Sequence, residues 1–477
     1  MKARALKENL LKKLGRGEEA ADLHRESLGI DPLYDRQPEK INHNTLLELM
    51  IDLYEAGDYT QGIALAEKWV EQKSAKGENI YPLVYYYIAY GYDNLPGAQA
   101  AGPAEHYAAL GEKAAADGCF PHRTEDYIVL KRLAAEYDLG MAYYYLGCLL
   151  YDKRVYGEAV ADYEKAALKY PEFPTVHRNL ALAYYNVKKQ PQRAYEELTK
   201  AFALDETDAR VYLELDQLKK RLNISMKERL SDMDKHFVLV KSRDDLYLEY
   251  VTLMNTLGEN AKALVLIEAR QFHQWEGKVA AQYLTALHQL AKAAVVKGDY
   301  AEAKSLLLRA VGEYPHNLGE GKLESAQENN LYYLLGLVQE KLGETEDALD
   351  CLTKACHGES EPVGMMYYND QPPEMIYYQG LAYRKLGDEE QAVQRFCKLV
   401  DYGKEHIGDE IKIDYFAVSL PDLLIFEENL NERNRKHCLF MMSLGLRGLG
   451  QTDEAKACAE ELLSMDNAHQ GIRVHDL

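Results

Sequence analysis

The chain is poor in proline and tryptophan, with 14 and 2 copies among 477 residues, and it lacks long apolar runs. So few prolines, with an ordinary 32 glycines, argue against a loop-rich all-β chain and against a fibrous one. No stretch approaches the ~20 apolar residues of a membrane span, and no apolar run follows the N-terminal lysines as in an export signal. Because 47% of the residues are hydrophobic, wholesale disorder is also excluded. We therefore expect a folded cytoplasmic protein.

Positive charge is scarce as well. The chain has 56 Lys and Arg residues against 77 Asp and Glu, which gives a formal net charge of -21. Such a balance repels nucleic-acid backbones and anionic lipid surfaces. The basic cluster Lys219-Lys220-Arg221 is too short to reverse this and is typical of the cationic end of a helix. We expect neither nucleic acid nor a membrane as a partner.

Motifs that would indicate chemistry are weak. The seven cysteines are scattered, and Cys351, Cys356 and His357 lack a second pair at the spacing of zinc ligands. Residues 319–323, GEGKL, lack both the first glycine of a phosphate loop and the Ser or Thr that would hold magnesium. No HExxH, GxSxG or CxxC pattern occurs. We expect no metal, no cofactor and no catalytic residue on this chain alone.

What the chain does contain is an internal repeat. A helix, a short turn with Gly and a second helix with Ala recur at residues 143–171, 287–315, 332–355, 377–399 and 439–462. These copies resemble tetratricopeptide repeats, in which two antiparallel helices cross at small residues. In the first copy, Gly147 marks the first helix, Ala159 and Ala166 mark the second, and Pro171 ends it.

The spacing of the second-helix marks predicts the number of hairpins. The marks are Ala20, Gly62, Ala108, Ala159, Ala194, Ala263, Ala303, Ala348, Ala392 and Ala455. The 69 residues from Ala194 to Ala263 are about twice the 34-residue unit, so a degenerate hairpin is expected within residues 209–241, with Asn223 at its turn. The 63 residues before Ala455 contain an insertion.

These intervals predict an all-α chain of about ten or eleven hairpins, stacked as one right-handed superhelical solenoid over residues 1–477. We expect irregular insertions near residues 93–106, 271–279, 314–326, 358–373 and 403–430.

Two groups of residues are candidates for binding. First-helix positions that would face a concave groove include Tyr144, Tyr151, Arg178, Tyr185, Tyr333 and Tyr377, drawn from an unusual total of 37 tyrosines. Packing of these rings between hairpins is the alternative. The second group lies in the long polar connections, for which simple turns are the alternative. The full candidate set is Tyr144, Arg178, Asn179, Tyr185, His273, Trp275, Glu276, His316, Asn317, Glu320, Lys322, Tyr368, Asn369, Asp370, Asp414, Tyr415 and Asp422.

Residues 177–181, 314–322, 367–376 and 412–426 resemble the C-terminal repeats of a family of large bacterial proteins. In that family the repeats follow a domain of unknown function that is similar to the galactose-mutarotase-like β-sandwich of carbohydrate-active enzymes. The β-sandwich is absent from this chain, which suggests a truncation or one half of a split system. Residues 272–278, FHQWEGK, are shorter than the corresponding family loop.

Two hypotheses for function follow. In the first, the concave face and the polar loops form a scaffold that binds a partner protein, which the resemblance implies to be a mutarotase-like β-sandwich. In the second, the loops complete a sugar site together with that domain, so that the chain is one component of a carbohydrate-active enzyme.

Overall fold

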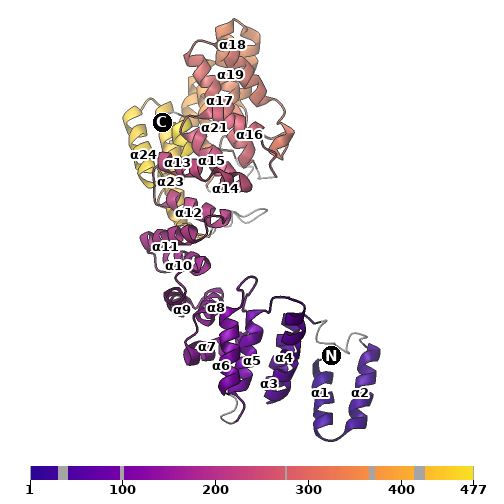
Figure 1. Cartoon of the computed structure of the whole chain (residues 1–477). Coiled ribbons are helices and arrows are strands. Elements are labelled where there is room, and N and C mark those ends of the chain that lie inside the picture. Colours follow the sequence, from indigo (N-terminus) through magenta and orange to yellow (C-terminus); the bar gives the residue numbers. More distant parts are fainter. Residues whose placement is uncertain are drawn as a thin grey trace. The chain divides into compact units, whose positions relative to one another are not determined.

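The chain is built from helices that pack in consecutive pairs (Figure 1). The computed structural model describes residues 2–30, 41–96, 101–273, 277–364, 371–412 and 425–475. Every regular element in these ranges is a helix, so the prediction of an all-α repeat fold is confirmed. The chain divides into two compact units, Met1–Leu204 and Asp205–Leu477. The single uninterrupted solenoid over the whole chain stays a prediction.

Unit 1 contains the first eleven helices. They are α1 (Lys2–Lys13), α2 (Gly17–Ile30), α3 (His43–Glu55), α4 (Tyr59–Ala75), α5 (Pro82–Asp93), α6 (Ala101–Lys113), α7 (Thr124–Tyr137), α8 (Gly140–Asp152), α9 (Tyr156–Lys169), α10 (Pro174–Asn186) and α11 (Pro191–Leu204).

Unit 2 contains the remaining helices. They are α12 (Ala209–Arg221), α13 (Met226–Lys235), α14 (Phe237–Ser242), α15 (Asp244–Thr256), α16 (Asn260–Glu268), α17 (Lys278–Val296), α18 (Tyr300–Val311), the short 3-10 helix η2 (His316–Leu318), α19 (Asn329–Leu342), α20 (Thr345–Cys356), α21 (Pro373–Lys385), α22 (Glu389–His406), α23 (Leu430–Gly448), α24 (Thr452–Met465) and α25 (Gln470–Val474). Among the described residues, no helix has the length and apolar character to cross a membrane.

Helices pair as α1–α2, α3–α4, α5–α6, α8–α9, α10–α11, α12–α13, α15–α16, α17–α18, α19–α20, α21–α22 and α23–α24. Within the described residues this agrees with the predicted ten or eleven hairpins. The predicted marks lie where paired helices touch, because Ala159, Ala194, Ala263 and Ala303 are fully buried. A Cβ on Gly147 would lie 2.7 Å from the ring of Tyr163, so only glycine lets α8 approach α9 this closely.

The degenerate hairpin predicted within residues 209–241 is present as α12 and α13, with Asn223 at the turn in a left-handed conformation (φ 53°). A buried ion cluster holds it together. The Arg229 guanidinium of α13 donates two hydrogen bonds to Asp216 of α12, at 2.9 and 2.6 Å, and one to Glu249 of α15 at 2.7 Å. Arg229 is 1% exposed, so the charges are paired away from water.

Helix α7 was not expected. It packs against α5 and α8 between the third hairpin and the next one, and it accounts for the long interval between Ala108 and Ala159. The irregular region expected near residues 93–106 is also shorter than expected, because α6 already begins at Ala101. Pro103 is compatible with this start, since the first turn of a helix needs no N–H from it.

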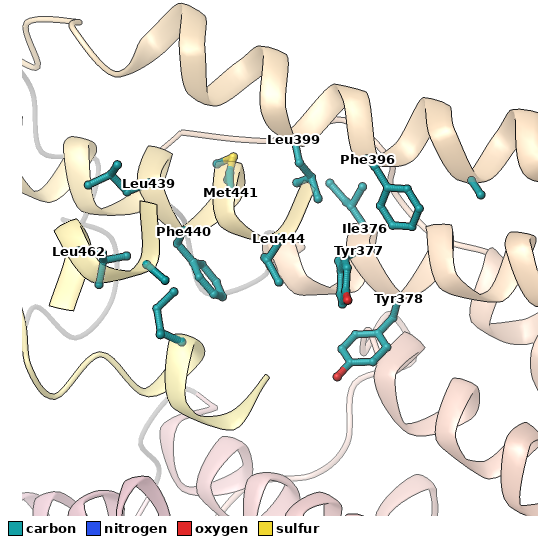
Figure 2. Packing of buried hydrophobic residues seen from close by; sticks show 13 residues of the cluster. Ile376, Tyr377, Tyr378, Phe396, Leu399, Leu439, Phe440, Met441, Leu444 and Leu462 are labelled. Atoms are coloured by element: carbon teal, nitrogen blue, oxygen red, sulfur yellow. The ribbon is translucent and has the colours of Figure 1, made fainter. Parts of the chain in front are cut away.

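The C-terminal part of unit 2 has a core shared by its last hairpins. Figure 2 shows Tyr377 between Phe396 and Leu444, with Phe440 near Leu444 and Leu462. The rings of Tyr377 and Phe396 are tilted against each other, with centroids 5.8 Å apart. Ile472 of the short helix α25 belongs to the same buried cluster. Residues near the end of the described chain are therefore packed against the first helices of the repeats that precede them.

Candidate functional site

Eight predicted site residues fall outside the described part of the chain. They are Trp275, Glu276, Tyr368, Asn369, Asp370, Asp414, Tyr415 and Asp422. The other nine lie in two places, on α8 and α10 in unit 1 and in two connections of unit 2.

The two polar connections of unit 2, which follow α16 and α18, contact each other. The main-chain N–H of Phe272 donates to the carbonyl of Asn317 at 2.8 Å. The Asn317 side chain in turn donates to the carbonyls of Ile267 and Arg270, at 2.8 and 3.0 Å, which are at the end of α16. The amide of Gln271 reaches the carbonyl of His316 at 3.4 Å. Asn317 therefore works as a structural link between neighbouring repeats.

The side chains of Glu320 and Lys322 also make hydrogen bonds within the fold. The Glu320 carboxylate accepts from the N–H of Gly277 at 2.7 Å and of Ala280 at 3.4 Å, so it caps the N-terminus of α17. The Lys322 ammonium donates to the carbonyl of Val311 at 2.6 Å and to the buried carboxylate of Glu328 at 2.7 Å. Both side chains shape the loop that carries them.

His273 is tied to a residue that the sequence analysis missed. Its Nδ1 lies 2.6 Å from Oδ2 of Asp244, whose other oxygen accepts from Nε of Arg270 at 2.8 Å. Although burial opposes it, hydrogen bonds from His273 and Arg270 lower the pKa of Asp244 to about 2. Asp244 begins α15, where a carboxylate is a common residue, so its sequence position did not distinguish it.

Three of the predicted residues of unit 1, Tyr144, Arg178 and Asn179, lie around Cys148. The Asn179 amide of α10 lies 3.7 Å from the Cys148 sulfur of α8, and the Arg178 guanidinium bonds the Asn179 side chain at 3.3 Å. Burial raises the pKa of the Cys148 thiol, and the nearby Arg178 charge opposes that rise. Arg178, Asn179 and Tyr185 are half-buried.

Tyr144 does not face the surface as predicted. It is 8% exposed, and its ring packs edge-on against Phe173 with the ring centroids 5.0 Å apart. Tyr377 is likewise buried, in α21. For these two rings the alternative of packing between helices holds, because the second helix of the same hairpin covers them.

A cleft of about 410 Å³ lies beside this face and was not predicted. Glu112, Met141, Lys169, Tyr170 and Phe173 are among its lining residues. Glu112 accepts from the N–H of Met141 at 3.0 Å at the start of α8. Lys169 pairs with Asp138 at 2.5 Å. The cleft therefore combines aromatic walls with a carboxylate. Its lining comes from α6, α8, α9 and the connections that follow α6 and α9, and no sequence motif connects these segments.

The inner side of unit 2 is occupied by the chain itself. Residues 470–475 contact α15, α17 and α21, and the main-chain oxygen of Val474 accepts from Gln289 at 2.9 Å and from Lys292 at 3.1 Å. This contact could not be predicted from the sequence, because a helix of five residues shows no repeat pattern. Among the described residues, no cluster of His, Cys, Asp or Glu has the arrangement of a metal site.

Comparison with known proteins supports the repeat assignment. Residues 137–209 and 288–361 match a sequence family described as tetratricopeptide repeat, and residues 374–402 and 437–469 match two further families with the same description.

Solved structures of similar proteins include yeast Tom70, which is 12% identical, with 99% of this chain and 94% of that chain covered and a TM-score of 0.30. A tetratricopeptide repeat protein from Parabacteroides merdae is 16% identical, with 62% and 98% covered and a TM-score of 0.25. Similarities of this size imply neither a partner nor a ligand. Within these four matched ranges, the chain carries tetratricopeptide repeats.

Proposed function

We propose that the chain is a protein-interaction scaffold whose unit 1 binds a folded partner domain through the inner face of α8 and α10. The observation that carries this proposal is the half-buried set Arg178, Asn179 and Tyr185 on α10, of which Arg178 and Asn179 lie beside Cys148 of α8. Arg and Tyr are the residue types that most often dominate binding energy at protein interfaces. Stacked hairpins present their first helices as an extended inner surface, which is how helical repeats generally bind partners.

The partner that fits best is a galactose-mutarotase-like β-sandwich domain, as the family resemblance implies. The adjoining cleft supports such a partner, because Glu112, Tyr170 and Phe173 line it and a loop of a folded domain could occupy it. The net charge of -21 favours a loop with a basic side chain.

The proposal is tested by titrating the full chain with a purified galactose-mutarotase-like β-sandwich domain in a calorimeter. We expect Arg178→Glu and Tyr185→Ala each to weaken binding at least tenfold, which corresponds to about 1.4 kcal/mol. Leu168→Ala is the control, since Leu168 is 83% exposed on α9, which is not one of the two helices that form the proposed face. Equal affinities for all variants would refute this face as the binding surface, and absence of binding would refute the β-sandwich as the partner.

The alternative, a component of a carbohydrate-active enzyme, has less support. Glu320, Asn317 and Lys322 all satisfy helix ends or neighbouring carbonyls. Their hydrogen-bonding groups are thus already engaged within the fold. Turnover of an oligosaccharide by the reconstituted pair, but by neither part alone, would favour the enzyme hypothesis instead.

A further inference from the structure

Residues 470–475 lie across α15, α17 and α21, each of which is the first helix of its hairpin, in the way a bound peptide would. The side chains of Gln470 and Gln282 of α17 exchange two hydrogen bonds, both 3.0 Å long, and Gln470 also donates to Thr256 of α15 at 3.2 Å. A paired amide of this kind fixes the entry of the segment into the groove. The two amide side chains bury little apolar surface at the Gln470 end of the segment.

The groove also recognises the backbone of the segment. Gln289 and Lys292 lie one turn apart on α17, and both donate to the main-chain oxygen of Val474, at 2.9 and 3.1 Å. A contact with a main-chain carbonyl does not depend on which side chain the peptide carries. These two donors would therefore hold any segment that follows the same path.

Side-chain pockets add selectivity. Ile472 is 2% exposed among the rings and aliphatic groups of α21 and α23. Three positions later, His475 places Nδ1 3.1 Å from the hydroxyl of Tyr378. A Cβ on Gly471 would lie 2.6 Å from Phe440, so the backbone passes directly over that ring. The groove thus contacts both an aliphatic side chain and an imidazole that lies three positions further along the segment.

The segment has little structure of its own. A five-residue helix is far below the ~12 residues at which an isolated helix becomes even marginal in water. Its conformation is held by α15, α17, α21 and α23, as a groove holds a peptide.

We propose that the inner face of unit 2, formed by Gln282, Gln289, Lys292 and Tyr378, is a peptide-binding groove that residues 470–475 occupy in cis. Its occupant in a complex is a short helical turn of a partner protein, with an aliphatic residue followed three positions later by histidine. The proposal goes beyond the surface of unit 1 and stands if that surface binds nothing. The partner must compete with a tethered segment, whose effective concentration is on the order of millimolar.

The test uses the full chain and a fluorescein-labelled peptide of residues 467–475, NAHQGIRVH, with fluorescence anisotropy as the readout. Two variants release the tethered segment: Ile472→Asp, and Gln470→Ala combined with His475→Ala. We expect each to bind the peptide at least tenfold more tightly than the wild-type chain does. Adding Gln289→Ala and Lys292→Ala to a released variant should abolish that gain. Adding Val296→Ala should not, because Val296 is 87% exposed on the same helix.

Equal peptide affinity of the wild-type and released chains would overturn the proposal, as would binding that ignores Gln289 and Lys292. Dimerisation of a released variant, measured by sedimentation equilibrium, would make a second copy the occupant and overturn the partner assignment. Hydrogen exchange of the wild-type chain tests the idea even if the released variants unfold. The amides of residues 470–475 should exchange at least tenfold faster than those of α23, and exchange in step with α23 would make the segment an integral part of the core.

Discussion

At the scale of single residues, close helix crossings depend on glycines whose missing Cβ makes room for an aromatic ring. Gly147 of α8 faces Tyr163, and a Cβ there would lie 2.7 Å from the ring. In a helix, alanine is normally more stable than glycine by up to ~1 kcal/mol, whereas overpacking a core costs ~1–3 kcal/mol of stability. We expect Gly147→Ala to lower the free energy of unfolding of this hairpin by about 1–2 kcal/mol, measured by urea denaturation.

The matched control for this prediction is Gly157→Ala in the partner helix α9. Nothing lies within 4 Å of a Cβ at Gly157, so the helix preference of alanine should act alone and stability should stay equal or rise. If both variants lose the same stability, the close crossing is not the reason for glycine at position 147.

Tyrosine shows what residue types alone could and could not predict. The excess of tyrosine suggested rings between hairpins with polar tips, and several hydroxyls do pair with carboxylates, such as Tyr87 with Asp126 at 2.8 Å. Tyr92 and Tyr107 share Glu67, at 2.7 and 3.0 Å. The partners could not be predicted, because each carboxylate lies 25 or more positions away on another helix.

At the scale of elements, the helices of the α12–α13 hairpin are joined by buried ion pairs, whereas other hairpins pack through small residues. Its position and its turn at Asn223 were predictable, because the repeat interval leaves room for one more pair. The buried cluster of Arg229, Asp216 and Glu249 was not predictable, since charged residues on helices are most often solvated. Likewise α7 carries no repeat mark, and the cap that Glu320 gives α17 comes from a residue more than 40 positions beyond the helix start.

The ion cluster makes a prediction for Arg229→Met. Two carboxylates would lose their buried cation, which typically costs ~3–5 kcal/mol, and urea denaturation of the full chain should show this loss in unit 2. Burial raises the pKa of Asp216 even with Arg229 opposing it, so without Arg229 the folded state favours the protonated acid more strongly. A group whose pKa is raised by folding adds stability at low pH and loses it as pH rises.

The deficit of Arg229→Met should therefore shrink as pH falls from 7 toward 4. Arg16→Met is a suitable control, because Arg16 pairs with Glu19 at the surface and such pairs contribute little. A deficit that is independent of pH would mean that lost packing of the long side chain, and not unpaired charge, causes the effect.

At the scale of the whole molecule, unit 2 departs from a simple solenoid because its first and last hairpins touch. Repeats normally contact only their neighbours, so their stability is a sum of local terms. Here Asn223, in the α12–α13 turn, donates to the carbonyl of Met465 at 3.1 Å and accepts from the N–H of Asn467 at 3.0 Å. Contacts across more than 240 residues therefore join the two ends of this unit.

Removing the side chain of Asn223 tests this closure. Asn223→Gly keeps the positive φ of 53° but deletes the contacts to Met465 and the N–H of Asn467, so we expect unit 2 to lose about 1–2 kcal/mol. Hydrogen exchange should show α24 opening before α12 and α13, whereas in the wild type they open together. Arg154→Gly, at a turn of unit 1 with φ 61°, should lose nothing, because glycine accommodates that conformation. If α24 and α12 still exchange together in Asn223→Gly, the shared core around Phe440 and Ile472 couples the ends of unit 2, and the turn contact is incidental.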